Sequence, residues 1–230
     1  MAFLLDPEKT AVAHFIETFE RINELCQLVQ RELYVEKFFL FVGGSTMQDV
    51  DLNEWITAAK EIIKIPIVIF PGSHHQLSES AHGLLFLNLI SGDNPDYLIG
   101  QQRHAAALLK TSNLEIIPTG YLLIDGGRES AVQRVSRTVP LSQEDIETII
   151  NTAFAGELMG NQLIYLEAGS GAINPVQPEI ITAVKDQLHI PLIIGGGLRS
   201  LQQLKDSYQA GADLLVVGTA IEENVNWNNT

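Results

Sequence analysis

The sequence contains only one cysteine, Cys26, so the chain cannot form a disulfide bond within itself. It has no CxxC pair, and its histidines form neither an HxH nor an HExxH arrangement. These absences argue against a zinc site built from paired cysteines or histidines. Low cysteine content is also typical of a reducing compartment, and we therefore expect a cytoplasmic location.

Positive charge is scarce as well. Lys and Arg number 14 against 28 Asp and Glu, which gives a formal net charge of −14. A chain with this balance repels nucleic acid and anionic membrane surfaces, so we expect no nucleic-acid partner. A phosphorylated ligand would have to be bound locally, by backbone amides, a few cations or a metal ion.

Long hydrophobic runs are missing too: none approaches the roughly 18 residues that a membrane-spanning helix needs. The opening stretch, MAFLLDPEKT, has no basic segment ahead of its apolar residues and does not resemble a signal peptide. The sequence contains no Pro- or Ser-rich linker, so we expect one domain over residues 1–230. With 46% hydrophobic and 18% charged residues, the composition is typical of a globular protein.

The sequence does contain eight short apolar runs at regular spacing. They do not alternate polar and apolar residues, which is typical of strands buried on both faces of a parallel sheet. Stretches with helical periodicity separate most of them, which favours repeated strand–helix units. Eight such units in 230 residues predict an α/β protein with a modified (β/α)8 TIM barrel. The predicted strands are 2–6, 37–44, 65–72, 84–90, 114–124, 161–169, 190–197 and 212–219.

The predicted helices are 10–32, 51–63, 95–110, 142–158, 175–188 and 200–210. Pro7 and Pro175 suit the first turn of a helix, and Ser142 suits an N-cap. Residues 73–83 are too few and too polar for a full helix, so the crossover after the third strand is predicted to be degenerate. Residues 124–140 are predicted to form an inserted loop or short helix above the barrel.

Glycine-containing exits follow the last two predicted strands. IIGGGLRS ends the seventh strand with Gly196 and Gly197, and VVGTAIEEN ends the eighth with Gly218 and Thr219. Glycines let backbone amides approach an anion, and barrel enzymes commonly hold phosphate at these two loops. The alternative is that the glycines only form tight turns, but two such exits in series favour phosphate.

The sixth predicted strand runs into YLEAGSG, where an acidic residue stands among glycines. Tyr165 and Glu167 fall on the same side of this strand, which would face the barrel mouth. A buried carboxylate needs a partner, and a ligand hydroxyl would supply one. Glu167 would then bind that hydroxyl or act as a general base, while Ser170 and its flanking glycines face a phosphate. The structural alternative is a glutamate paired with Arg or Lys inside the barrel.

Oxygen-bearing side chains follow the first two predicted strands. Asp6 ends the first strand, and Ser45 and Thr46 follow two glycines after the second. Such oxygens suit Mg²⁺, which often bridges to substrate phosphates. The commoner structural roles are an Asp6 cap on a helix that begins at Pro7, and N-caps at Ser45 or Thr46. Four aromatic residues either line an apolar cavity or simply form core: Phe70, Phe86, Tyr97 and Tyr121.

Together these motifs resemble those of the geranylgeranylglyceryl phosphate synthases, whose relatives include the heptaprenylglyceryl phosphate synthases. The matching stretches run in the family order over nearly the whole chain, and NPDYLIG with PTGYLLIDGG resembles the second of two family groups. One departure is Leu4, where the first group has a lysine. The stretches are LLDPEK, VGGST, IPIVIFPGS, LLFLNLISGDNPDYLIG, IIPTGYLLIDGG, YLEAGSGA, LIIGGGLRS and VVGTAIEE.

The resemblance implies a Mg²⁺-dependent prenyltransferase. It would join the 3-hydroxyl of sn-glycerol 1-phosphate to a long-chain allylic prenyl diphosphate, geranylgeranyl diphosphate above all, and release diphosphate. By motif, Asp6 and Ser45, with Thr46 as the alternative, would hold the metal. Glu167 would be the catalytic residue, and Tyr97 would line an apolar groove for the prenyl tail. The glycerol phosphate would contact Tyr165, Leu166, Glu167, Ala168, Gly169, Ser170, Gly171, Gly196, Gly197, Gly218 and Thr219.

The resemblance also implies a homo-oligomer, either a dimer or a hexamer, and a peripheral membrane contact when product is released. Two other functions stay open on the residues alone. One is a phosphate-binding barrel enzyme that acts on a sugar phosphate; it would need an acid–base pair or a Schiff-base lysine at a strand end, which we do not find. The other is a barrel that binds a prenyl or phosphate ligand without turnover, and this would be insensitive to Glu167→Gln.

Overall fold

Eight parallel strands close into a barrel in chain order in the computed structural model, which describes residues 1–47 and 50–227. Each strand pairs with the next, and β8 returns to β1 through the pairs Ala2↔Val216 and Phe3↔Val217. The predicted (β/α)8 barrel is therefore confirmed. The strands are β1 (Ala2–Leu5), β2 (Phe39–Val42), β3 (Ile67–Ile69), β4 (Gly83–Leu89), β5 (Glu115–Leu123), β6 (Leu163–Glu167), β7 (Leu192–Gly195) and β8 (Leu214–Val217).

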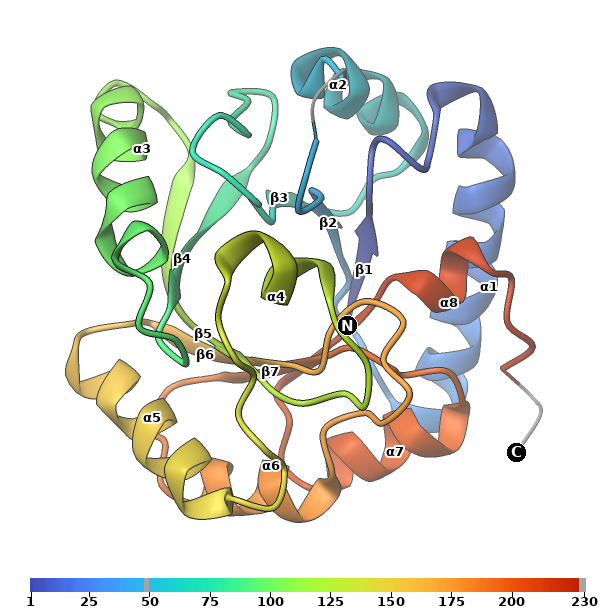
Figure 1. Cartoon of the computed structure of the whole chain (residues 1–230). Helices are drawn as coiled ribbons and strands as arrows, with labels where there is room; N and C mark the ends of the chain where they lie inside the picture. The colour runs from blue at the N-terminus through green and yellow to red at the C-terminus, as the bar shows by residue number, and fades with distance from the viewer. Residues whose placement is uncertain (48–49, 228–230) are drawn as a thin grey trace.

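Helices surround the barrel, as Figure 1 shows, and each of the six predicted helical stretches is present. No helix of the described residues is long and apolar enough to cross a membrane. The helices are η1 (Val12–His14), α1 (Phe15–Leu33), α2 (Leu52–Ile62), the π-helical turn η2 (Asp96–Gly100), α3 (Gln101–Leu109), α4 (Ala131–Ser136), α5 (Ile146–Leu158), α6 (Pro178–Lys185), α7 (Leu201–Gln209) and α8 (Thr219–Glu222).

Two predicted helix starts are wrong by three residues. The N-cap of α5 is Asp145, whose carboxylate accepts a hydrogen bond from the Thr148 amide at 3.1 Å, and Ser142 lies upstream in the loop. The proline in the first turn of α6 is Pro178 and not Pro175. In each case two residues of suitable type compete for one helix start, and sequence alone does not choose between them.

The crossover between β3 and β4 has no helix, as predicted, and residues 70–82 form turns. Because β3 is only three residues long, it pairs with just the first two residues of β4. The side chain of Gln102, on α3, compensates by donating a hydrogen bond to the backbone oxygen of Leu87 on β4. Beyond its first two residues, β4 has no paired strand on the side that faces β3. We call this the open side of β4.

The insertion after β5 folds back over the barrel. Residues 124–140 contain one short helix, α4, which begins after Ser130; the Ser130 hydroxyl accepts from the Gln133 amide at 3.1 Å. Figure 1 shows α4 above the mouth of the barrel. The predicted inserted loop or short helix is therefore present, and we call residues 126–136 the lid.

The hydrophobic core has two layers, one between the barrel and its helices and one inside the barrel. Three aromatic rings fill the upper part of the inner layer. Phe70 lies 6.0 Å from Tyr121 and 5.5 Å from Tyr165, and the two tyrosine rings are 5.3 Å apart, centroid to centroid. This cluster closes the barrel interior and forms the floor on which the site is built.

Candidate active site

A cavity of about 490 Å³ opens at the carboxyl-terminal end of the strands, beneath the lid. This is the end at which TIM barrels carry their active sites. Most of the predicted site residues line it, and so do the four aromatic residues named above as cavity candidates. Those predicted site residues are Asp6, Ser45, Thr46, Tyr97, Glu167, Gly169, Ser170, Gly171, Gly196, Gly197, Gly218 and Thr219.

Three residues of the predicted glycerol phosphate set do not line the cavity. Leu166 and Ala168 point outward from β6 and pack in the layer between the barrel and its helices, as strand alternation requires. Tyr165 points inward but is fully buried in the aromatic floor. Its hydroxyl lies near the Glu167 carboxylate and makes no regular hydrogen bond with any described residue. Tyr165 therefore reaches the site only through Glu167.

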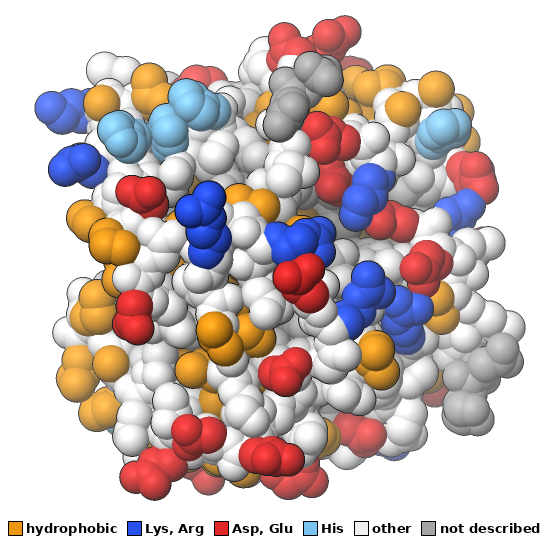
Figure 2. Space-filling model, in the orientation of Figure 1, with side chains coloured by type: hydrophobic (Ala, Val, Ile, Leu, Met, Phe, Trp, Pro, Cys, Tyr) orange, Lys and Arg blue, Asp and Glu red, His pale blue; other side chains and the backbone are white. Residues whose placement is uncertain are grey.

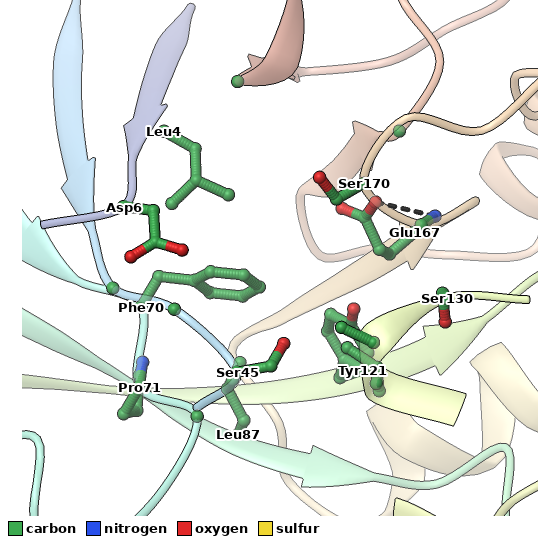
Figure 3. Close-up of a pocket in the computed structure, with 18 of the residues that line it drawn as sticks. Leu4, Asp6, Ser45, Phe70, Pro71, Leu87, Tyr121, Ser130, Glu167 and Ser170 are labelled. Atoms are coloured by element: carbon green, nitrogen blue, oxygen red, sulfur yellow. Dashed lines mark hydrogen bonds between the residues drawn. The ribbon is translucent and has the colours of Figure 1, made fainter. Parts of the chain in front are cut away.

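Glu167 ends β6 and points into the cavity with only 6% of its surface exposed. One carboxylate oxygen, Oε1, accepts a hydrogen bond from the Gly169 amide at 2.8 Å, drawn as a dashed line in Figure 3. Burial raises the pKa of Glu167, and the Tyr165 hydroxyl and the Gly169 amide partly oppose this shift. The alternative of a glutamate paired with Arg or Lys is wrong, because no described residue forms an ion pair with Glu167.

The glycine exits of β6, β7 and β8 meet around this carboxylate. The hydroxyl oxygens of Ser170 and Thr219 are 3.0 Å apart and join the exits of β6 and β8. Gly196, on the exit of β7, has φ of +85°, and a Cβ atom there would lie 2.6 Å from Oε1 of Glu167. The close approach of the two loops thus requires a glycine at this position. Three loops that can present backbone amides surround one acid.

Asp6 and Ser45 lie on the opposite side of the cavity from Glu167 and Ser170, as Figure 3 shows. The prediction that a helix begins at Pro7 is wrong: residues 7–9 form a turn, whose Glu8 amide donates to the Asp6 carboxylate at 3.1 Å. Lys9 Nζ lies 3.8 Å from Asp6 and 3.7 Å from Glu222. Burial raises the pKa of Asp6, and Lys9 acts in the opposite direction.

The Asp6 carboxylate and the Ser45 hydroxyl form a donor set of hard oxygens, which is the kind that Mg²⁺ prefers. No group of three or more His, Cys, Asp or Glu side chains among the described residues is placed to hold a metal ion. Magnesium sites commonly use one or two carboxylates and complete their coordination with substrate phosphates and water. The residues present therefore fit a Mg²⁺ ion that is bound together with a phosphorylated substrate.

An apolar groove leads away from this polar part of the cavity. Its lining includes Leu77 from the helix-free loop 70–82, Leu84 and Phe86 from β4, and Ala105 from α3. Tyr97, at the π-helical turn η2, lines the same groove and is half-buried. The groove exists because the crossover after β3 lacks a helix.

Several cavity residues were not among the predicted site residues, and Gln102, Arg128 and Glu222 are three of them. Glu222 lies three residues after the predicted phosphate residue Thr219, and the helical period, which places these two positions on one face, was the available signal. Arg128 belongs to the insertion, whose general position was predicted but whose side chains were not assigned. The role of Gln102 depends on the unpaired side of β4, which only the folded barrel reveals.

Comparison with known proteins gives a consistent result. The sequence model of the PcrB family matches residues 2–229. A protein of Zunongwangia profunda named geranylgeranylglyceryl phosphate synthase is 48% identical over 222 residues, which are 96% of this chain and 90% of that protein. A protein of Pyrococcus furiosus with the same name is 36% identical over 95% of this chain and 83% of its own length.

A solved structure shares both the fold and the sequence. It is the crystal structure of (S)-3-O-geranylgeranylglyceryl phosphate synthase from Thermoplasma acidophilum in complex with its substrate sn-glycerol-1-phosphate. The TM-score is 0.83 and the sequence identity 33%, over 96% of this chain and 85% of that chain. The eight-stranded barrel and its order of elements are thus those of these synthases.

Proposed function

This chain belongs to the PcrB family, and we propose that it forms an ether between sn-glycerol 1-phosphate and a long-chain allylic prenyl diphosphate. Like its curated relatives, it is an enzyme of the transferase class. One observation carries the proposal. A single cavity joins a buried carboxylate among glycine loops to an apolar groove, so that a phosphorylated polyol and a prenyl chain can meet in it.

The polyol substrate fits the side of the cavity formed by β6, β7 and β8. Backbone amides of the glycine loops suit its phosphate, and the Glu167 carboxylate suits its hydroxyls. A phosphate alone would be repelled by Glu167, whereas a glycerol phosphate uses both kinds of group at once. The Thermoplasma acidophilum relative, whose crystal structure contains this compound, supports the choice of substrate.

The reaction would be a substitution at the first carbon of the prenyl chain. The 3-hydroxyl of glycerol phosphate gives its proton to Glu167, and an oxygen lone pair forms the new C–O bond. The bond between that carbon and the diphosphate oxygen breaks, and its electron pair leaves with diphosphate. The Glu167 carboxylate suits this role because a raised pKa makes it a better base.

Asp6 and Ser45 would hold Mg²⁺ together with the diphosphate, and Thr46 is a further hydroxyl nearby. When bound, the ion supplies positive charge that stabilises the diphosphate as it leaves. The protein's own contribution is to place this leaving group across the cavity from Glu167, so that the attacking hydroxyl and the reacting carbon are held together.

We expect Asp6→Asn to lower turnover by about 10²-fold, on the scale of a lost metal contact, and to raise the Mg²⁺ concentration that gives half-maximal rate. A magnesium titration of initial rates measures both effects. An unchanged half-maximal concentration would remove Asp6 from the metal site.

The proposal is tested by product formation. Purified protein with Mg²⁺ is incubated with each enantiomer of glycerol phosphate and with prenyl diphosphates of several lengths, and ether product is sought by mass spectrometry. We expect product with sn-glycerol 1-phosphate and a long donor, and little with the other enantiomer. Folded protein that gives no ether with any pair would refute the proposal and favour a binding barrel without turnover.

A further inference from the structure

Four Lys and Arg side chains line the cavity, and three of them form ion pairs with carboxylates. The paired ones are Lys9 with Asp6 and Glu222, Arg134 with Glu129, and Arg199 with Glu223. The fourth, Arg128, forms no ion pair with any residue in the described ranges 1–47 and 50–227. Lys and Arg side chains gather at the middle of the face seen in Figure 2, where the lid crosses the barrel, although the chain as a whole is acidic.

Backbone contacts fix the position of Arg128. The lid begins at Gly126, whose carbonyl oxygen accepts hydrogen bonds from the amides of Ile173 and Asn174 at 2.9 and 3.0 Å. Two residues later, Nη1 of Arg128 donates to the carbonyl oxygen of Gly171 at 3.2 Å. The guanidinium is therefore held against the glycine exit of β6, by the same stretch of chain that closes the cavity.

The guanidinium has donors to spare. An arginine carries five N–H groups in a planar fork, and Gly171 accepts from only one nitrogen. Planar forks of this kind match the oxygens of a phosphate and bind them with charge-assisted hydrogen bonds. The hydroxyls of Ser170 and Thr219 lie in the adjoining loops. An anion at this place would meet a cation, two hydroxyls and backbone amides together.

We propose that Arg128 binds the phosphate group of sn-glycerol 1-phosphate, so that the lid supplies the side-chain cation of the phosphate site. The inference rests on the proposed function and names a residue that lies outside the predicted site residues. The leaving diphosphate is a poorer match for Arg128, because Asp6 and Ser45 lie across the cavity from Ser130 and Ser170 (Figure 3).

The test is equilibrium binding of sn-glycerol 1-phosphate, measured by calorimetry with wild type, Arg128→Gln, Arg128→Lys and Arg134→Gln. Arg134→Gln is the matched control, because it removes the same charge from the same lid at a residue already paired with Glu129. We expect Arg128→Gln to weaken binding about tenfold, Arg128→Lys to weaken it less, and the control to bind like wild type. Raising the ionic strength from about 0.05 to 0.5 M should weaken wild type more than Arg128→Gln.

Steady-state kinetics supply a second readout. Arg128→Gln should raise the KM for glycerol phosphate and leave the KM for prenyl diphosphate unchanged, which a merely structural role of the lid would not do. Equal binding by wild type and Arg128→Gln would overturn the inference and leave the proposed function intact. A wild type that does not bind glycerol phosphate would instead overturn both. If Arg128→Gln does not fold, tight binding by Arg128→Lys with wild-type salt dependence supports the proposal, and loss of the control's binding contradicts it.

Discussion

At the scale of single residues, Glu167 has an environment that costs the fold energy and suits the reaction. Its carboxylate is buried, it has no basic partner among the described residues, and only the Gly169 amide donates to it with regular geometry. Burying a charge without a countercharge is unfavourable, so a sequence selected for stability alone would place an uncharged residue there. Under the proposed function, this loss of stability accompanies a carboxylate that takes part in the reaction.

The burial of this carboxylate predicts a pH-dependent gain in stability for Glu167→Gln. Because burial raises the pKa of Glu167, the folded protein holds this proton more tightly than the unfolded chain does. The contribution of this carboxyl to folding stability is fully present below its pKa in the unfolded chain, and it is lost as the pH rises through its pKa in the folded protein. The amide of the variant would stay neutral at every pH, and its oxygen could still accept from Gly169. In thermal melts we expect the melting temperature of the variant to exceed that of wild type at pH 8, and by more than it does at pH 4. A larger difference at pH 4 than at pH 8 would contradict the prediction.

Replacing Gly196 tests two effects of an added side chain, namely backbone strain and displacement of the Glu167 carboxylate. An alanine there would be strained at φ +85°, and its Cβ atom would lie 2.6 Å from Oε1 of Glu167 and 2.7 Å from the backbone nitrogen of Gly169. Gly160 is the control, because it has φ +93° but no atom within 4 Å of an added Cβ. We expect Gly160→Ala to lose about 1–2 kcal/mol of stability from backbone strain, and Gly196→Ala to lose more because its Cβ atom would also meet backbone atoms. Only Gly196→Ala should also lose turnover, by tenfold or more; equal activity of the two variants would contradict this.

At the scale of elements, the absence of a helix between β3 and β4 leaves room for the apolar groove beside β4. Ordinary βαβ units cover each strand with a helix, and here the turns at 70–82 leave β4 open toward α3. The Gln102 side chain satisfies a backbone oxygen that a longer β3 would have bonded. The side chain of Gln102 therefore replaces a hydrogen bond that the shortened β3 does not make, and the groove left by the missing helix is apolar.

Filling this groove should change which donors react. Ala105 on α3 is buried and lines the groove, whereas Ala106 is exposed on the same helix. We expect Ala105→Trp to raise the KM for long prenyl diphosphates by about tenfold or more and to affect short ones little, as lost burial of several methylene groups implies. Ala106→Trp is the control for helix stability. Equal effects on long and short donors would show that the tail lies elsewhere.

At the scale of the whole molecule, much of the architecture was predictable because burial on both faces leaves continuous apolar runs, and eight of them mark eight strands. Helix starts were less predictable than strands. Asp145 and Ser142 are both residues that cap helices well, and tertiary packing selects Asp145. The glycine-containing loops that line the cavity could be located because they follow strand ends. The positions of Arg128 and Gln102 in the cavity could not be predicted from the sequence, because their hydrogen-bond partners are 43 and 15 residues away in the chain.

The most direct test of the account is the turnover of Glu167→Gln beside wild type and Glu179→Gln, an exposed acid-to-amide control on α6. Initial rates are measured with sn-glycerol 1-phosphate, a long prenyl diphosphate and saturating Mg²⁺. If Glu167 takes the proton, its variant should lose about 10²-fold or more in kcat while it melts no lower than wild type, and the control should keep its rate. A Glu167→Gln enzyme that turns over within about twofold of wild type would contradict the central claim that this buried carboxylate carries the reaction.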